Sequence, residues 1–321
     1  MPDMPRALGR RSVLVAAGLL TLSGCVAAPA SSTEPVGDRR VRVTTTTNFL
    51  TDTVGRIGGD RVEVTGLMGP GVDPHLYRAS AGDVQALRGA DMILYCGLHL
   101  EGRMGDLFAD LAERQLTRAV TDGIPREQLL AAAPGEEEHD PHVWFDVSLW
   151  SHVSESIAAT LIQRDPAHAD GYRQRLNAYL AELAALDAEI EQRLAAIPPQ
   201  RRVLVTSHDA FAYFGRRYQL EVAGIQGIST AAEATTADVE RVAKLVAERG
   251  VPAVFVESSV PRQTIDALLA SAAQHGARIH VGGELYTDAA GNPGTPEGTY
   301  IGMLRANANR IADGLTSTLE G

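Results

Sequence analysis

The tripeptide Asp-Pro-His occurs twice in this chain, as Asp73-Pro74-His75 and as Asp140-Pro141-His142. Proline fixes its own φ and restricts the residue before it, so each imidazole is presented from a stiffened backbone. Two rigidly mounted imidazoles predict a metal site that is assembled from distant parts of one fold. Because short motifs recur by chance, the repeat alone leaves open the alternative of an incidental turn sequence.

Two further candidate ligands follow strand-like segments in the second half of the chain. His208 comes directly after residues 203–207, and Asp288 follows the strand-like run near Ile279. In an α/β sheet, ligands bind beyond the carboxyl ends of the strands, and His75 also follows a strand-like run. Three imidazoles and one carboxylate suit Zn²⁺, Mn²⁺ or Fe²⁺. Each half of the chain would then contribute two candidate ligands to a cleft between two lobes.

The elements that must position these side chains form an α/β pattern. Strand-like runs lie at 41–46, 61–67, 92–96, 203–206, 220–223, 253–256 and 278–281, and helical patterns lie at 49–57, 211–218, 236–249, 263–275 and 300–319. This alternation predicts parallel strands with crossover helices. Apolar residues at steps of three and four, uninterrupted by proline, predict one long helix over 166–197. We expect it to join two lobes; a long helix packed on a single domain is the alternative.

The N-terminus is typical of an exported lipoprotein. Arginines precede a short apolar stretch that ends in Leu22-Ser23-Gly24-Cys25, which is similar to a bacterial lipobox. Cleavage before Cys25 would leave a lipidated N-terminal cysteine, whereas an ordinary secretory signal with an incidental cysteine is the alternative. The division that we expect is a lipoprotein signal peptide at 1–24, a flexible tether at 25–38, an N-terminal α/β lobe at 39–165, a linking helix at 166–197 and a C-terminal α/β lobe at 198–321.

The charge and the cysteine content of the chain limit which binding partners and which cross-links we expect. The formal net charge of −11 makes nucleic acid a poor candidate and is compatible with attracting cations. Cys96 is the only cysteine besides Cys25, so lipidation of Cys25 would leave no intramolecular disulfide. The apolar run around Cys96 predicts a buried strand residue.

The chain resembles the cluster 9 family, the metal-binding solute-binding proteins of bacterial zinc, manganese and iron ABC transporters. The resemblance covers nearly the whole chain after the signal, and no single motif carries it. It rests on five motifs in the family's order: 71–77 (GVDPHLY), 140–146 (DPHVWFD), 207–214 (SHDAFAYF), 256–259 (VESS) and 284–288 (ELYTD).

This resemblance implies a site, a fold and a function. The metal ligands would be His75, His142, His208 and Asp288. The fold would be two Rossmann-like α/β lobes joined by a single long backbone helix, with the metal in the interlobe cleft and a limited opening motion. The chain would be a monomeric, extracytoplasmic binding protein, lipid-anchored to the cell membrane through Cys25. It would not be an enzyme, and it would deliver Mn²⁺ or Zn²⁺, or else Fe²⁺, to an ABC transporter permease with its cytoplasmic ATPase.

Some alternatives stay open at this point. Glu257 ends a strand near the expected cleft and is a candidate hydrogen-bond partner for a ligand histidine, or else a carboxylate bonded to backbone. A zinc-dependent hydrolase with Glu257 as its base is one alternative function, and a surface adhesin is another. The short acidic loop at 136–139 departs from the long His-rich loop of many zinc-specific members, so the choice of metal is left open, as is the export route.

Overall fold

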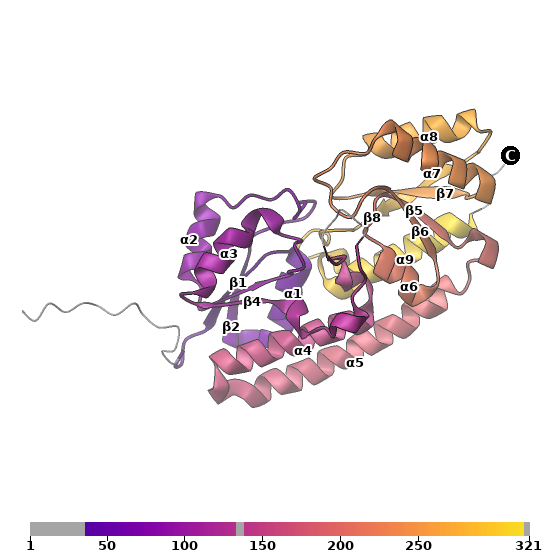
Figure 1. Cartoon of the computed structure of the whole chain (residues 1–321). Helices are drawn as coiled ribbons and strands as arrows, with labels where there is room; N and C mark the ends of the chain where they lie inside the picture. Colours follow the sequence, from indigo (N-terminus) through magenta and orange to yellow (C-terminus); the bar gives the residue numbers. More distant parts are fainter. Residues whose placement is uncertain (1–35, 133–137, 318–321) are drawn as a thin grey trace, which may run out of the picture.

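Two α/β halves rest on a pair of long helices, α4 (Val147–Arg164) and α5 (Ala169–Leu194), in the arrangement that Figure 1 shows. The computed structural model describes residues 36–132 and 138–317. The expected signal peptide, Cys25 and residues 25–35 of the expected tether lie outside the described residues. No helix in the described ranges is long and apolar enough to cross a membrane.

The N-terminal half is built on a parallel sheet with the order β2-β1-β3-β4. Its strands are β1 (Val41–Thr45), β2 (Val62–Gly66), β3 (Met92–Tyr95) and β4 (Leu116–Ala119), and its crossover helices are α1 (Asn48–Gly58), α2 (Ala81–Gly89) and α3 (Gly105–Ala112). The β-branched run of β1 suits a central, buried strand. Ser80 is the N-cap of α2 and forms a capping box with Asp83. The loop that carries His75 therefore ends at Ser80.

The C-terminal half contains two pairs of parallel strands. Strand β5 (Val203–His208) pairs with β6 (Glu221–Gln226), and β7 (Ala253–Glu257) pairs with β8 (His280–Leu285). Strands β5 and β7 lie side by side, and the backbone N–H of His208 donates to Oε1 of Glu257 at 2.9 Å. The helices of this half are α6 (Ala212–Tyr218), α7 (Thr236–Arg249), α8 (Gln263–Gln274) and α9 (Tyr300–Thr316).

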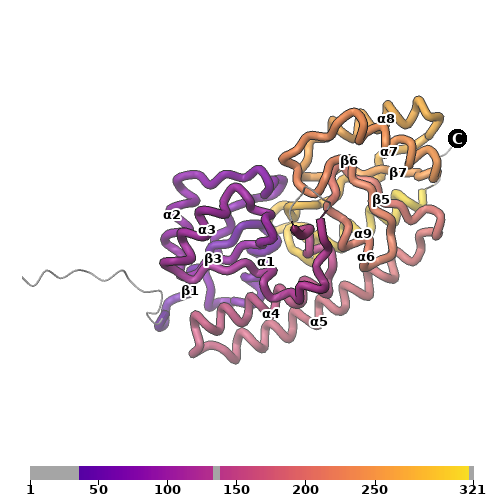
Figure 2. Tube along the Cα trace, in the orientation of Figure 1, coloured from indigo at the N-terminus to yellow at the C-terminus, as the bar shows by residue number. Residues whose placement is uncertain are grey.

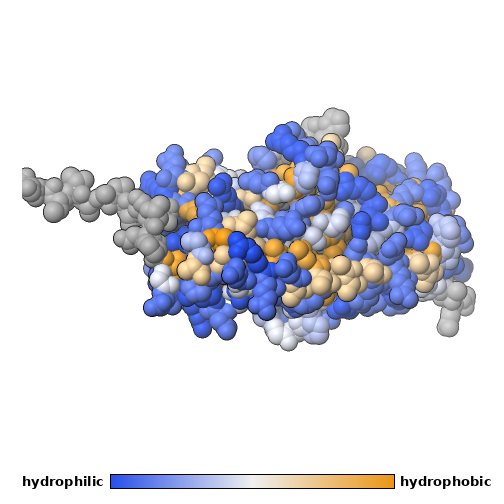
Figure 3. Space-filling model, turned by 90° about the horizontal axis from the view of Figure 1, so that it is seen from below, coloured by the Kyte–Doolittle hydropathy of each residue, from blue (hydrophilic) through white to orange (hydrophobic). Residues whose placement is uncertain are grey.

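Helix α5 runs beneath both halves, with α4 alongside its first part (Figures 1 and 2). It has 26 residues and is therefore about 39 Å long. The helix predicted over 166–197 is confirmed over Ala169–Leu194. Residues Pro166–His168 form a separate 3₁₀ turn before it. Seen from below, the surface is mostly hydrophilic with smaller apolar areas between the polar side chains (Figure 3).

Several elements differ from the sequence prediction, which named none of the helices α2, α3 and α4. Strand β4 was not predicted, because its sequence Leu-Thr-Arg-Ala is short and carries little apolar signal. Strand β8 begins two residues later than predicted and continues through Gly282 and Gly283. A Cβ atom at Gly282 would lie 2.7 Å from the Phe255 ring, so this glycine makes room for a neighbouring side chain rather than ending the strand.

One hydrophobic core joins the two halves. Buried side chains of β1 and α1 belong to the same cluster as those of α4, α5 and α9, and the cluster continues to Phe255 of β7 and Leu285 of β8. Each half also has a smaller cluster of its own on its outer side. The shared core places the carboxyl ends of the strands of both halves around one region. The lobe boundaries at 165 and 198 stay our prediction.

Candidate metal centre

Four side chains meet where the two halves face each other. His75 lies in the loop between β2 and α2, and His142 lies directly before the 3₁₀ turn Val143–Phe145. His208 is the last residue of β5, and Asp288 follows the end of β8. All four are buried, and one ligand atom from each lies within 4.8 Å of the others. The structure therefore brings together all four residues that the sequence analysis named as ligands.

The distances between these atoms leave room for an ion among them. His75 Nε2 lies 3.3 Å from His142 Nε2. His142 Nε2 lies 3.6 Å from Asp288 Oδ1, and His208 Nε2 lies 3.7 Å from Asp288 Oδ2. The Nε2 atoms thus converge on one carboxylate, and a cation bound between them would contact three nitrogens and one or two oxygens. This donor set suits a divalent transition metal.

Unpaired polar atoms point to the same conclusion. His208 Nε2 and Asp288 Oδ1 are buried and have no hydrogen-bond partner among the described residues. Buried polar atoms almost always have a hydrogen-bond partner, so two neighbouring atoms without one need an explanation. A metal ion held by these atoms would satisfy both.

Neighbouring side chains fix the orientation of three of the four candidate ligands. Asp140 Oδ1 lies 2.7 Å from His142 Nδ1, and Glu257 Oε2 lies 2.5 Å from His208 Nδ1. Ser259 donates its hydroxyl to Asp288 Oδ2 at 2.9 Å. A carboxylate at Nδ1 holds the proton there and directs the Nε2 lone pair into the site.

Sequence reasoning named Glu257 as a partner of a ligand histidine, and Glu257 does contact His208. It missed Asp140 and Ser259. The position of Asp140 two residues before a histidine was the available signal for the first. The motif at 256–259 contains Ser259, but it did not reveal the contact with Asp288, which forms only in the folded chain.

The electrostatics of the metal-free site follow from burial and from these carboxylates. Burial, opposed by Asp288 and reinforced by His142 and His208, lowers the pKa of His75 to about 3. Burial disfavours the charged form of His142, but Asp140 and Asp288 outweigh it and raise its pKa to about 9.

The same opposition at His208 leaves its pKa well above the usual value, because burial is outweighed by Glu257 and Asp288. Burial alone would raise the pKa of Asp288, yet His208 and His142 hold it well below its usual range. The neighbouring carboxylates thus raise the pKa of His142 and His208 and these imidazoles lower that of Asp288, so a divalent cation at the Nε2 atoms would compete with protons there.

Aromatic side chains close one side of the site. The buried Trp144 ring lies 5.1 Å from the His142 ring between centroids, and its Nε1–H donates to the carbonyl of Thr287 at 3.0 Å. Tyr300 donates its hydroxyl to the carbonyl of Trp144 at 2.7 Å. These contacts cross between the halves, so the Trp144 side chain holds the segments of His142 and Asp288 together.

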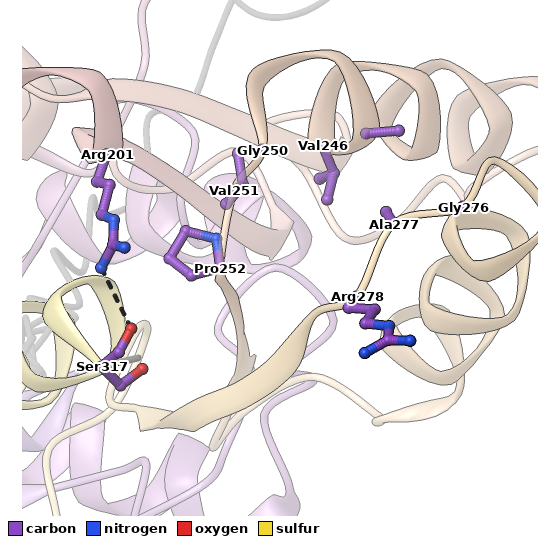
Figure 4. A pocket seen from close by; sticks show the side chains of 10 residues that line it. Arg201, Val246, Gly250, Val251, Pro252, Gly276, Ala277, Arg278 and Ser317 are labelled. Carbon is purple, nitrogen blue, oxygen red and sulfur yellow. Dashed lines mark hydrogen bonds between the residues drawn. The ribbon is translucent and has the colours of Figure 1, made fainter. Parts of the chain in front are cut away.

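A separate cavity in the C-terminal half is lined by none of these residues. A hollow of about 490 Å³ lies at the base of the C-terminal half, between the start of β7 and the end of α9 (Figure 4). Its walls include Val251, Pro252 and Ala277, and Arg201 there donates to the carbonyl of Ser317 at 3.2 Å. The chemistry predicted from the sequence is thus gathered in the small, buried cluster and not in this open hollow.

Two α/β halves joined by a long helix, with three imidazoles and one carboxylate buried between them, define a two-lobed metal-binding protein. The profile of the ZnuA family, described as "Zinc-uptake complex component A periplasmic", matches residues 43–314. The chain belongs to this family, and the resemblance to metal-binding proteins of ABC transporters that its motifs indicated is confirmed.

Individual relatives cover almost the whole chain. The manganese-binding lipoprotein MntA of Bacillus subtilis is 43% identical over 305 residues, which are 95% of this chain and 99% of MntA. The iron ABC transporter substrate-binding lipoprotein MtsA of Streptococcus pyogenes serotype M1 is 30% identical over 96% of this chain and 99% of its own.

Among solved structures, the periplasmic zinc-binding protein TroA of Treponema pallidum matches with a TM-score of 0.84 and 45% identity, over 87% of this chain and 100% of that chain. The predicted fold class of two α/β lobes with a long helix is confirmed by this match.

Proposed function

We propose that this chain captures a divalent transition metal outside the cytoplasm through His75, His142, His208 and Asp288 and delivers it to an ABC transporter permease for import. The observation that carries the proposal is the convergence of four buried ligand atoms within 4.8 Å of one another. Membership of a metal-uptake family and the names of its relatives support the transport role.

The contacts of Glu257 favour metal binding over hydrolysis. A hydrolytic zinc site needs an open coordination position and a free general base. Both carboxylate oxygens of Glu257 are engaged by His208, at its backbone N–H and at Nδ1. With four protein ligands and this carboxylate engaged, the arrangement suits retention of a metal rather than activation of water.

The ligand assignment is tested by replacing one candidate ligand from each half. We expect His75→Ala and Asp288→Ala to weaken Zn²⁺ and Mn²⁺ binding by more than the ~10–100-fold that loss of a residue supporting a ligand costs. Competition with a chromophoric chelator measures the affinities. His275→Ala is the matched control, because this exposed histidine pairs with Glu240 on the surface of the C-terminal half. Unchanged affinity in both ligand variants would refute the assignment.

The transported metal is Mn²⁺ or Zn²⁺, with Fe²⁺ as the third option, since the relatives are named for manganese, zinc and iron. Intrinsic affinity follows the Irving–Williams order, so tighter binding of Zn²⁺ in vitro does not identify the transported ion. Growth of a deletion strain rescued by one metal alone identifies it.

The anchor is the lipidated Cys25, a proposal supported by the word lipoprotein in the relatives' names. Release of a Cys25→Ala variant from the membrane fraction tests it, and retention there would contradict it.

A further inference from the structure

The loop that carries His75 also contacts the C-terminal half. Thr230, in the segment between β6 and α7, donates its hydroxyl to Oδ2 of Asp73 at 2.6 Å. Gly71 in the same loop has φ +70°, and a Cβ there would lie 3.3 Å from the carbonyl oxygen of Ser258. The loop of one half is therefore fitted closely against two segments of the other.

Asp73 links this contact directly to His75. Its Oδ1 accepts the backbone N–H of His75 at 2.8 Å, while its Oδ2 accepts the hydroxyl of Thr230. One carboxylate thus holds the backbone of a candidate metal ligand with one oxygen and the opposite half with the other. A displacement of Thr230 relative to the N-terminal half acts on His75 through a single side chain.

The second Asp-Pro-His tripeptide is used differently. Asp140 Oδ1 accepts from the backbone N–H of His142 at 2.9 Å and also lies 2.7 Å from its Nδ1, while Asp140 Oδ2 has no partner among the described residues. Both carboxylates hold the backbone of their own histidine. The carboxylate of Asp73 also accepts a side-chain hydroxyl of the other half, whereas Asp140 accepts the Tyr213 hydroxyl at its backbone carbonyl. The link through Thr230 is therefore a separate feature and not a by-product of the repeated tripeptide.

The hydrogen bond between Thr230 and Asp73 lies where a contact can open and close. Two other hydrogen bonds between the halves near the site, from Trp144 to Thr287 and from Tyr213 to Asp140, involve fully buried side chains. Asp73 and Thr230 are only half-buried, and His75 is the most exposed candidate ligand at 7%. The bond between Asp73 and Thr230 can break without unpacking the core.

We infer that Asp73 and Thr230 form a clasp between the halves that positions His75 and slows release of the bound metal. This inference rests on the proposed function, because it assigns the clasp to the same site. Thr230 is a positioning residue, since it acts on the metal only through Asp73 and His75. Loss of a hydrogen bond to a charged group raises a dissociation rate by roughly 10-fold when the bond is broken in the transition state for release.

The test compares Thr230→Val with Thr230→Ser in the full mature chain loaded with Zn²⁺. Valine keeps the shape of threonine without the hydroxyl, whereas serine keeps the hydroxyl. Stopped-flow mixing with excess chelator measures the metal dissociation rate. We expect Thr230→Val to raise the rate roughly 10-fold and Thr230→Ser to stay within about 2-fold of the unmodified chain. The melting temperature of the metal-free protein should not change in either variant.

Thr117→Val is the matched control, because this half-buried threonine donates to the carbonyl of Gln115 within one half. Thr230→Ala serves as a second variant if the valine variant does not fold. A Thr230→Val rate equal to that of the unmodified chain, or a serine variant as fast as the valine variant, overturns the clasp. If the unmodified chain itself does not retain Zn²⁺, it is the proposed function that fails instead.

Discussion

At the scale of single residues, the three imidazoles of the site are supported unequally. His142 and His208 each have a buried carboxylate at Nδ1, contributed by Asp140 and Glu257. His75 has its backbone held by Asp73 instead. Because a carboxylate at Nδ1 fixes the tautomer and raises the basicity of Nε2, two of the three nitrogens are prepared for a cation before it arrives.

Asp140→Asn tests this preparation. The amide oxygen can still accept the backbone N–H of His142, so the substitution mainly removes negative charge from Nδ1. We expect Zn²⁺ affinity to fall by about 10–100-fold, with little change in the stability of the metal-free protein. Competition titration measures the affinity, and Asp313→Asn, an exposed aspartate of α9 that pairs with Arg193, is the control. Equal affinities for Asp140→Asn and the control would show that the charge of Asp140 does not act on the metal.

How far the sequence predicts this site depends on where each contact comes from. His75, His142, His208 and Asp288 could be named because each follows a strand or repeats a motif that resembles a known family. Asp140 belongs to a motif that the sequence analysis quoted. Its contact with His142 Nδ1 could not be predicted, because it depends on the rotamer of the His142 ring. The hydrogen bond of Ser259 to Asp288 depends on how the ends of β7 and β8 pack together.

At the scale of elements, α5 connects the halves through two kinds of contact. Leu183 is fully buried in the core cluster that both halves share. Glu189 forms an ion pair with Arg305 of α9 at 2.7 Å, with both side chains about half-exposed. The periodicity that predicted the helix from sequence came from the buried face. The bounds of the helix were less predictable, because they depend on the 3₁₀ turn that begins at Pro166.

We expect Leu183→Ala to lower the free energy of unfolding by about 3 kcal/mol, because it leaves a cavity in the shared core. Glu189→Gln should cost no more than about 1 kcal/mol, since exposed ion pairs are weak. Denaturant unfolding of the metal-free protein measures both changes. If the two substitutions cost the same, the contribution of α5 would come from its surface ion pairs and not from its buried face.

At the scale of the whole molecule, the metal site lies at the junction of two halves that already share a core. The alternation of strands and helices predicted two α/β lobes, and the five motifs indicated their arrangement. Which side chains cross between the lobes could not be read from either, because contacts such as Asn48 to Ala290 join residues far apart in the chain. The shared core favours a small opening motion, in which loops such as that of His75 move and the core stays packed.

A cation held by both halves should stabilise the folded chain as a unit. A ligand at 100 times its dissociation constant adds about 2.7 kcal/mol to stability, which corresponds to a rise of roughly 5–10 °C in melting temperature for a protein of this size. We expect Zn²⁺ or Mn²⁺ to produce this rise in differential scanning calorimetry, and excess EDTA to reverse it.

Mg²⁺ should not produce the rise, because it prefers oxygen ligands and keeps much of its water. Asp288→Ala should abolish it, since the three remaining imidazoles lack the carboxylate that His142 and His208 both face. A rise of equal size in Asp288→Ala would place the stabilising metal somewhere other than between the halves. A rise confined to one half, seen as two separate unfolding transitions, would show that the shared core does not couple them.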